Sequence, residues 1–140
     1  SLRQACEPIE AALARSPRPL VPAHVDAGAP NFVLDADGRL WLVDWDYAGF
    51  NSPLFDLANL STNAGFGEAE ENFLLEQYFG RKPDRPLKQR FLAMAAASAL
   101  RETLWSMTSE LYSVTVTDFA AYTSENRQRF EMSFLRYDFY

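Results

Sequence analysis

A chain of 140 residues, 48% hydrophobic and 23% charged, has the size and composition of one globular domain with a substantial core. Its net charge of −6 and the lack of a lysine or arginine block argue against a nucleic-acid partner. The single cysteine, Cys6, excludes an internal disulfide and is typical of a reducing cytoplasm, and with only one histidine a zinc site is not expected. The longest apolar run, Phe91 to Leu100, is too short to cross a membrane, so we expect a cytoplasmic protein without a membrane partner.

The N-terminal part of the chain predicts a helix followed by an extended segment. Apolar residues recur at helical spacing from Leu2 to Ala14, and Pro17 and Pro19 end this helix. Leu20 to Ala23 should then be extended and lead into a polar loop that begins at His24.

A β-hairpin is the clearest local signal in the chain. Phe32 to Leu34 and Leu40 to Val43 are rich in strand formers, and the Asp37-Gly38 step between them supplies the positive φ of a tight turn. Because the two strands pair, Asn31 and Asp44 should lie at neighbouring strand ends.

The remainder of the chain is predicted to be helical. We expect an irregular segment from Ala48 to Asn51, after which Ser52-Pro53 begins the first helix with a capping hydroxyl before a proline. The expected helices are about Pro53 to Thr62, Glu68 to Phe79, Pro86 to Tyr112, and Thr117 to about Tyr137. Phe91 to Met107 is apolar almost all round, which predicts a central buried helix.

The polar residues around the hairpin have the chemistry of phosphoryl transfer. His24, Asp26 and Asn31 form the pattern H-x-D-x4-N, and Asp44 follows at the end of a strand. A loop carboxylate can accept a hydroxyl proton, while an amide oxygen and a second carboxylate are hard ligands that suit magnesium. One residue that orients a hydroxyl, with ligands for metal-bound phosphates, is most of what a kinase needs on this side of its site.

The order of three motifs resembles the aminoglycoside phosphotransferase and choline/ethanolamine kinase superfamily. After H-x-D-x4-N come Val43-Asp44-Trp45-Asp46-Tyr47-Ala48-Gly49 and Phe55-Asp56-Leu57-Ala58-Asn59, which are similar to the family's I-D-W-E/D-Y-A-G and F/W-D-L-A motifs. The segment between them is more similar to the choline/ethanolamine kinase branch. The resemblance implies an α+β, predominantly helical fold: a protein-kinase-like C-terminal lobe whose hairpin carries the catalytic and metal-binding loops.

The resemblance also implies a role for each motif residue. Asp26 would accept or orient the hydroxyl proton, Asn31 and Asp44 would hold Mg²⁺, His24 would brace the catalytic loop, and Asp56 would accept hydrogen bonds from the backbone around that loop. The chain departs from the family pattern at Ala27 and at Gly28-Ala29-Pro30, where a large apolar residue and often Pro-Gly are usual. This departure leaves the shape and the activity of the loop open.

Several residues are candidates for contact with a cationic substrate. Aromatic faces and a carboxylate hold a quaternary ammonium well, and choline kinases carry such tryptophans on a helix after the metal site. Glu102 and Trp105 share a helical face at that place, although Thr108 stands where the second tryptophan is usual. Asp46 is either a further carboxylate near the metal or a substrate contact. Tyr47 is a weaker aromatic candidate, as is Tyr112.

The elements that normally cover a nucleotide are not seen in this sequence. No glycine-rich strand-turn-strand and no lysine on an apolar strand precede His24. We therefore expect residues 1–140 to be a single domain, the catalytic and substrate lobe of a larger kinase, with the N-terminal nucleotide lobe absent and little activity alone.

The leading hypothesis is an ATP- and Mg²⁺-dependent phosphotransferase acting on a small cationic alcohol, most simply choline or ethanolamine. An aminoglycoside, a sugar or a thiamine-like alcohol would use the same chemistry. A different class is a pseudokinase-like lobe that binds a cationic ligand without transfer. A metal-dependent phosphohydrolase is less compatible, because the clustered histidines and acids of two-metal sites are missing.

Overall fold

The computed structural model describes residues 7, 10, 11, 14, 19–113 and 118–140. The helix predicted from Leu2 to Ala14 lies mostly outside these residues, although the backbone at Glu7, Glu10, Ala11 and Ala14 is helical. In chain order the elements are β1 (Val21–Ala23), the 3-10 helix η1 (Ala29–Asn31), β2 (Phe32–Leu34), β3 (Leu40–Leu42), β4 (Gly49–Asn51), α2 (Pro53–Ala64), α3 (Glu68–Phe79), α4 (Arg85–Tyr112) and α5 (Phe119–Asp138).

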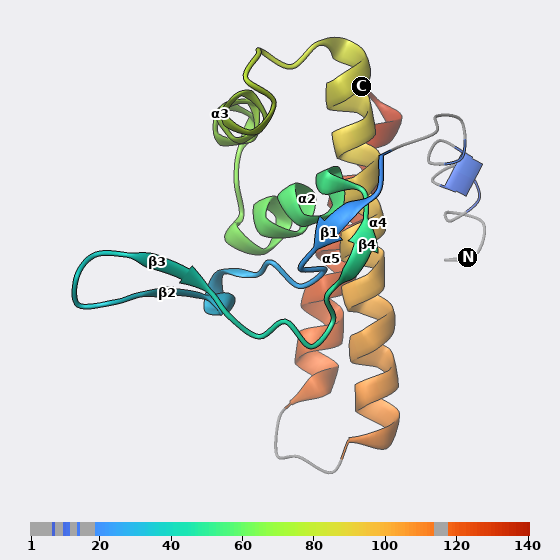
Figure 1. Ribbon diagram of the computed structural model, residues 1–140. Coiled ribbons are helices and arrows are strands. Elements are labelled where there is room, and N and C mark those ends of the chain that lie inside the picture. The colour runs from blue at the N-terminus through green and yellow to red at the C-terminus, as the bar shows by residue number, and fades with distance from the viewer. Residues whose placement is uncertain (1–6, 8–9, 12–13, 15–18, 114–117) are drawn as a thin grey trace.

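The long helix α4 is the axis of the molecule (Figure 1). Helix α5 lies along one side of it, and α2 packs against its other side below α3. The fold is therefore α+β and predominantly helical, as predicted. None of the described helices has the length and hydrophobicity needed to cross a bilayer.

Capping residues mark the ends of α2 and the start of α4. The Ser52 hydroxyl accepts a hydrogen bond from the Leu54 N–H at the start of α2, and the Asp84 carboxylate caps Leu87 at the start of α4. Gly65 ends α2 with a positive φ of 67°, which glycine adopts without strain. These local signals explain why the predicted helix bounds agree closely with the observed ones.

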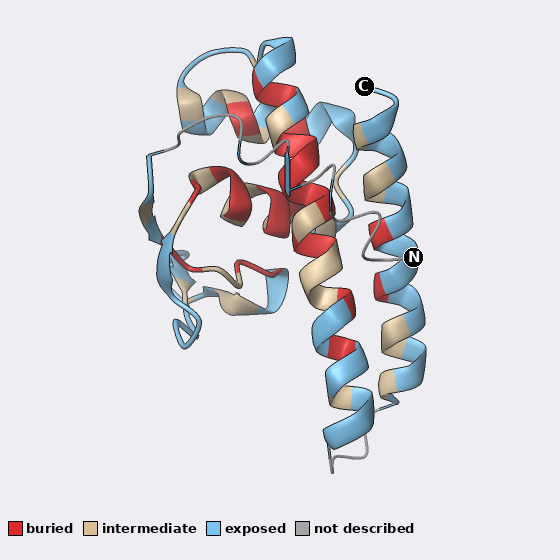
Figure 2. Ribbon diagram, turned by 90° about the vertical axis from the view of Figure 1, so that its right-hand side faces the viewer, coloured by how far each residue is buried: buried red, intermediate tan, exposed pale blue. Residues whose placement is uncertain are grey.

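The main core lies between α2, α3 and α4. Its centre is Phe91, which is fully buried, and Figure 2 shows the buried residues concentrated on α2 and the first half of α4. The members of this cluster are Leu54, Phe55, Ala58, Leu75, Leu87, Phe91, Leu92, Met94 and Ala95. Burial of large apolar side chains against three helices positions α2 and α4 relative to each other.

The second half of α4 is less buried than its composition predicts. Leu104, Trp105 and Met107 are each more than 40% exposed. In this half the buried positions are Ala99, Thr103 and Ser106, and the two hydroxyls hydrogen-bond back to carbonyls of their own helix. The expectation of a helix buried all round to Met107 is thus wrong, because α2 and α3 cover only the first half of α4.

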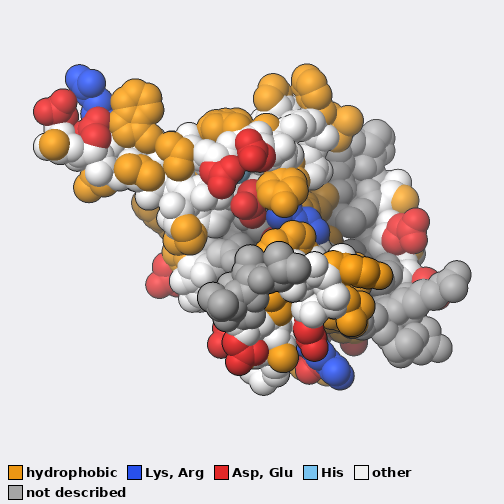
Figure 3. Space-filling view, turned by 90° about the horizontal axis from the view of Figure 1, so that it is seen from below, with side chains coloured by type: hydrophobic (Ala, Val, Ile, Leu, Met, Phe, Trp, Pro, Cys, Tyr) orange, Lys and Arg blue, Asp and Glu red, His pale blue; other side chains and the backbone are white. Residues whose placement is uncertain are grey.

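Two small antiparallel sheets accompany the helices. The predicted hairpin is present, with Val33 opposite Trp41, and it projects from the body of the molecule (Figure 3). The second sheet was not predicted: β4, expected to be irregular, pairs with β1 so that Pro22 lies opposite Phe50. Glycine and asparagine are poor strand formers, so only the distant partner strand makes this segment extended.

Candidate active site

The loop from His24 to Asn31 is held by the first turn of α2. The backbone N–H groups of His24 and Val25 donate to the two carboxylate oxygens of Asp56, at 2.7 and 2.8 Å. The Gly28 N–H closes a tight turn on the Asp26 carbonyl at 2.8 Å. These bonds fix the backbone on both sides of Asp26.

The same loop is tied to the strand that precedes Asp44. The buried His24 ring lies with Nε2 2.8 Å from the Val43 carbonyl oxygen, and the Val43 N–H donates to the Asn31 carbonyl at 2.9 Å. Because a carbonyl only accepts, Nε2 carries the proton. Trp45 packs edge-on against the imidazole with ring centroids 4.7 Å apart. The backbone just before Asp44 is thus fixed to both ends of the loop.

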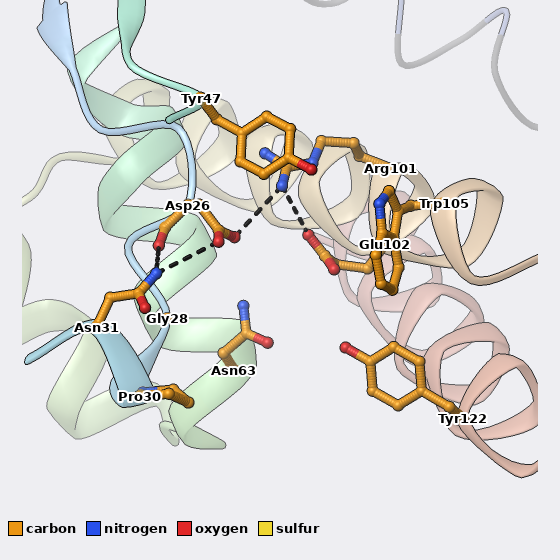
Figure 4. Close-up of a pocket in the computed structure, with 10 residues that line it drawn as sticks. All are labelled: Asp26, Gly28, Pro30, Asn31, Tyr47, Asn63, Arg101, Glu102, Trp105 and Tyr122. Carbon is orange, nitrogen blue, oxygen red and sulfur yellow. Dashed lines mark hydrogen bonds and ion pairs between the residues drawn. The ribbon is translucent and has the colours of Figure 1, made fainter. Parts of the chain in front are cut away.

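One cavity of about 220 Å³ brings together residues from the loop and from α4 (Figure 4). Five of the predicted site residues line it: Asp26, Asn31, Tyr47, Glu102 and Trp105. His24 and Asp56 do not, since they hold the loop from behind. Asp44 and Asp46 are exposed and also lie outside the cavity lining, as does Tyr112.

Within the cavity, the Asn31 amide is oriented by Asp26. Its Nδ2 donates to the Asp26 carbonyl at 2.8 Å and to the carboxylate Oδ2 at 3.3 Å. This leaves the amide Oδ1 without a hydrogen bond to any described residue, so it is available to a cation. A hard amide oxygen and the exposed Asp44 carboxylate fit the ligand set of Mg²⁺, which takes one or two carboxylates and completes its shell with phosphate and water oxygens. In the described part of the chain, no three acidic, histidine or cysteine side chains form a metal site by themselves.

Arg101 is one of the cavity residues that the sequence did not predict. Its guanidinium donates to the Val25 carbonyl, and Nη2 lies 3.3 Å from Asp26 Oδ1 and 3.1 Å from Glu102 Oε1. The Tyr47 and Phe55 rings flank it at 5.6 and 5.9 Å. The sequence did contain a signal for this contact. Arg101 directly follows a ten-residue apolar run, and an arginine beside a buried segment usually pairs with an acidic or carbonyl group.

Glu102 lines the cavity next to this arginine. Burial raises the pKa of its carboxyl group above the ordinary value, and the charge of Asp26 adds to this, while Arg101 and Arg129 oppose it. Its Oε1 has no hydrogen-bond partner among the described residues, although the Arg101 guanidinium is close. A carboxylate in this state gains from a cation placed in the cavity.

The far wall of the cavity is aromatic and was only partly predicted. Trp105 packs edge-on against Tyr122 of α5, with ring centroids 6.3 Å apart. Tyr122 and Asn63 of α2 also line the cavity, and neither belongs to a motif of its own. Their position depends on how α2 and α5 pack beside α4. Together these groups form a cavity with the Asp26 carboxylate at one end and Glu102, Trp105 and Tyr122 at the other.

Comparison with known proteins gives consistent relatives. The protein LicA of Haemophilus influenzae is 42% identical over 59 residues, which are 42% of this chain and 22% of that protein. A choline/ethanolamine kinase family protein from Mesorhizobium loti superimposes with a TM-score of 0.85 at 33% identity, over 93% of this chain and 44% of that one. The choline kinase LicA from Streptococcus pneumoniae gives a TM-score of 0.80 at 25% identity, over 96% and 47%.

The chain therefore spans less than half the length of these relatives. A family model described as "Phosphotransferase enzyme family" matches residues 2–93. Because this match covers well over half of the sequence and includes the loop, the hairpin and α2, the chain belongs to the phosphotransferase enzyme family.

Proposed function

We propose that residues 1–140 are the C-terminal lobe of a two-lobed cytoplasmic kinase. With ATP as donor and Mg²⁺ as cofactor, it would phosphorylate the hydroxyl of a small cationic alcohol, of which choline and ethanolamine are the first candidates. The further lobe would bind most of the nucleotide, and the cleft between the lobes would hold the γ-phosphate above Asp26.

The observation that carries this proposal is the set of residues that line the cavity beside Asp26. The Asp26 carboxylate, a group able to take a proton, shares it with Glu102 and Trp105, which suit a cation. An alcohol anchored by a cationic end near Glu102 has its hydroxyl within reach of Asp26. Such positioning is a major part of catalysis in phosphoryl transfer.

The transfer step would be direct. The acceptor oxygen bonds to the γ-phosphorus of ATP, the bond from that phosphorus to the oxygen of the ADP leaving group breaks, and the hydroxyl proton passes to the Asp26 carboxylate. Asn31 Oδ1 and the Asp44 carboxylate would hold Mg²⁺, whose charge, when bound, stabilises the phosphate oxygens. His24 and Asp56 would contribute by holding the loop and the strand in register.

The nature of the acceptor is supported by charge and by the relatives. The cavity is lined by two acidic residues, Asp26 and Glu102, and one basic residue, Arg101, a formal excess of one negative charge that suits a monocation. The similar solved structures include a choline/ethanolamine kinase family protein and a choline kinase. Tyr47 and Asp46 are further candidates for substrate contact, Tyr47 from the cavity wall and Asp46 from the exposed segment beside it.

A phosphorylation assay on the complete polypeptide tests the proposal. Labelled ATP would be offered with choline, ethanolamine, an aminoglycoside, a sugar and thiamine, and we expect label on one of the first two. Asp26→Asn should lower kcat by roughly 10²- to 10⁴-fold, the contribution of a general base. The control Asp37→Asn, in the exposed hairpin turn, should stay within about twofold of the unaltered protein.

Other outcomes would redirect the proposal. Label on the aminoglycoside, the sugar or thiamine would keep the chemistry and change the acceptor. No labelled product, together with calorimetric binding of choline that Mg-ATP leaves unchanged, would indicate a ligand-binding lobe without transfer. An Asp26→Asn enzyme within a few-fold of the unaltered one would remove Asp26 from the mechanism.

A further inference from the structure

We propose that Arg101 is a positioning residue that sets the direction of the Asp26 carboxylate. This inference rests on the proposed function, in which Asp26 receives the hydroxyl proton. The residue lies on α4, far along the chain from the loop, and its guanidinium faces Asp26 and Glu102 across the cavity (Figure 4). It belongs to none of the three motifs that carry the family resemblance.

Arg101 contacts the peptide unit that precedes Asp26. Val25 has a φ of 68°, a left-handed conformation that is strained for a β-branched residue. Its N–H donates to Asp56 Oδ1 at 2.8 Å, and its carbonyl accepts from Arg101. Two side chains from two different helices thus hold the strained residue at its two ends, and this fixes the direction in which the chain enters Asp26.

Arg101 also contacts the Asp26 carboxylate itself. One oxygen, Oδ2, accepts from Asn31 Nδ2 at 3.3 Å, while the other, Oδ1, lies 3.3 Å from Arg101 Nη2. Contacts on both oxygens restrict rotation of the carboxylate. Removal of the arginine leaves Asn31 as the remaining side-chain contact of this carboxylate among the described residues.

The contacts at this position require the shape of an arginine side chain. The planar guanidinium reaches the Val25 carbonyl, Asp26 and Glu102 at once, while Tyr47 and Phe55 flank it. A lysine has the charge but not the planar fork, so it cannot make all three contacts. The Arg101 side chain is still 31% exposed, and ion pairs of this exposure contribute little to stability. Its effect should therefore appear in the geometry of Asp26 more than in the stability of the fold.

The test compares Arg101→Met and Arg101→Lys in the complete polypeptide. We expect Arg101→Met to lower kcat roughly a hundredfold, the effect of displacing a reacting group by about 1 Å, with the KM for ATP unchanged. Arg101→Lys should have a kcat between those of Arg101→Met and the unaltered protein. A third variant, Arg101→Ala, leaves space for a small cation, and added guanidinium ion should restore part of its activity. The matched control Arg127→Met removes an arginine from an exposed ion pair on α5 and should stay within about twofold.

A double variant separates positioning from direct action. If Arg101 acts through Asp26, Asp26→Asn with Arg101→Met should be no slower than Asp26→Asn alone. The proposal would be overturned if the kcat losses of the two single variants multiplied in the double variant. It would also be overturned if a rise in the KM for ATP accounted for the whole loss of activity in Arg101→Met. Full recovery of kcat by lysine would overturn it as well.

A measurement independent of activity keeps this inference distinct from the proposed function. The amide protons of His24, Val25 and Gly28 are hydrogen-bonded in the loop, so Arg101→Met should speed their hydrogen exchange while the amides of α4 stay protected. If the unaltered protein transfers no phosphoryl group but this difference is found, the proposed function fails and the positioning role remains. Unchanged exchange at these amides would refute the positioning role.

Discussion

Two residues beside the site have backbone conformations that only glycine adopts freely. Val25 has a φ of 68° and Asp44 a φ of 64°. Such a conformation costs about 1–3 kcal/mol for an ordinary residue and is common where a site fixes its groups. At Val25 the bonds to Asp56 and Arg101 offset the strain. At Asp44 the preceding residue, Val43, is held by His24 and Asn31.

Asp44 allows a direct test of the proposed metal site. Asp44→Asn should raise the Mg²⁺ concentration that gives half-maximal transfer by roughly tenfold or more. Even the loss of a residue that only hydrogen-bonds to a metal ligand lowers metal affinity by about that factor. The fold should be unaffected, since the carboxylate is exposed and makes no hydrogen bond within the described ranges. A Mg²⁺ titration of the kinase assay measures the effect, with Asp37→Asn as control. An unchanged Mg²⁺ requirement would exclude Asp44 as a ligand.

At the scale of the elements, a buried charge cluster joins α3, α4 and α5. The Glu71 carboxylate, 1% exposed, accepts from Lys88 Nζ at 2.9 Å and from both Arg136 nitrogens at 2.7 and 2.8 Å. Burial alone would raise the pKa of Glu71, but the hydrogen bonds from Arg136 and Lys88 outweigh it and hold that pKa below its ordinary value. The cluster fixes the end of α5 against the other two helices.

Glu71→Met should therefore lower the free energy of unfolding by about 3–5 kcal/mol, because it leaves Lys88 buried without its charged partner. The double variant Glu71→Met with Lys88→Met should lose less free energy of unfolding than Glu71→Met alone. Because folding depresses the pKa of Glu71, its stabilisation is present above the ordinary value of 4.5 and is lost as pH falls through the folded-state pKa. Urea denaturation at neutral and at low pH measures both effects.

The control for this cluster is Glu131→Met, which removes only an exposed ion pair with Arg127 and should change stability little. A single Glu71 variant as stable as the unaltered protein would show that the cluster does not hold α5. The difference in free energy of unfolding between Glu71→Met and the unaltered protein should shrink as pH falls. A difference that grows would contradict the direction of the pKa shift of Glu71.

At the scale of the whole molecule, apolar side chains are exposed on the strands near the site. Val33, Leu34, Leu40 and Trp41 of the hairpin and Phe50 of β4 are each at least 46% exposed. The hairpin exposes its four side chains on both faces, because successive residues of a strand point to opposite sides. Exposed apolar side chains of this size are typical of surfaces that pack against another structure, and the proposed nucleotide-binding lobe would supply one.

The 140 residues by themselves should therefore bind ATP weakly. In the proposed two-lobed kinase the further lobe would supply half of the cleft, and the residues that line the described cavity include no glycine-rich loop for the phosphates. Calorimetry with Mg-ATP should give a much weaker affinity for this chain than for the complete polypeptide. Tight binding by the chain alone would show that the proposed division into lobes is wrong.

Many features of this protein followed from local sequence patterns. The hairpin was predictable because Asp37-Gly38 provides the turn, and Asp35 reinforces it by accepting from the N–H groups of Asp37 and Arg39. The four helices were predictable from their caps and apolar spacing. The strand pairing of Gly49–Asn51 was not, because its partner, Val21–Ala23, lies far away in the sequence.

The motifs alone predict the roles of Asp26, Asn31 and Asp44, because the residue types and their order are local properties of the chain. Only the tertiary structure decided that Arg101 meets Val25 and Asp26, and that Tyr122 and Asn63 complete the cavity wall. Those contacts depend on the packing of α2 and α5 against α4, which is set by the shape of the whole core. A local sequence pattern does not determine the distances between residues that are far apart in the chain. The relative positions of the site residues therefore follow only from the tertiary structure.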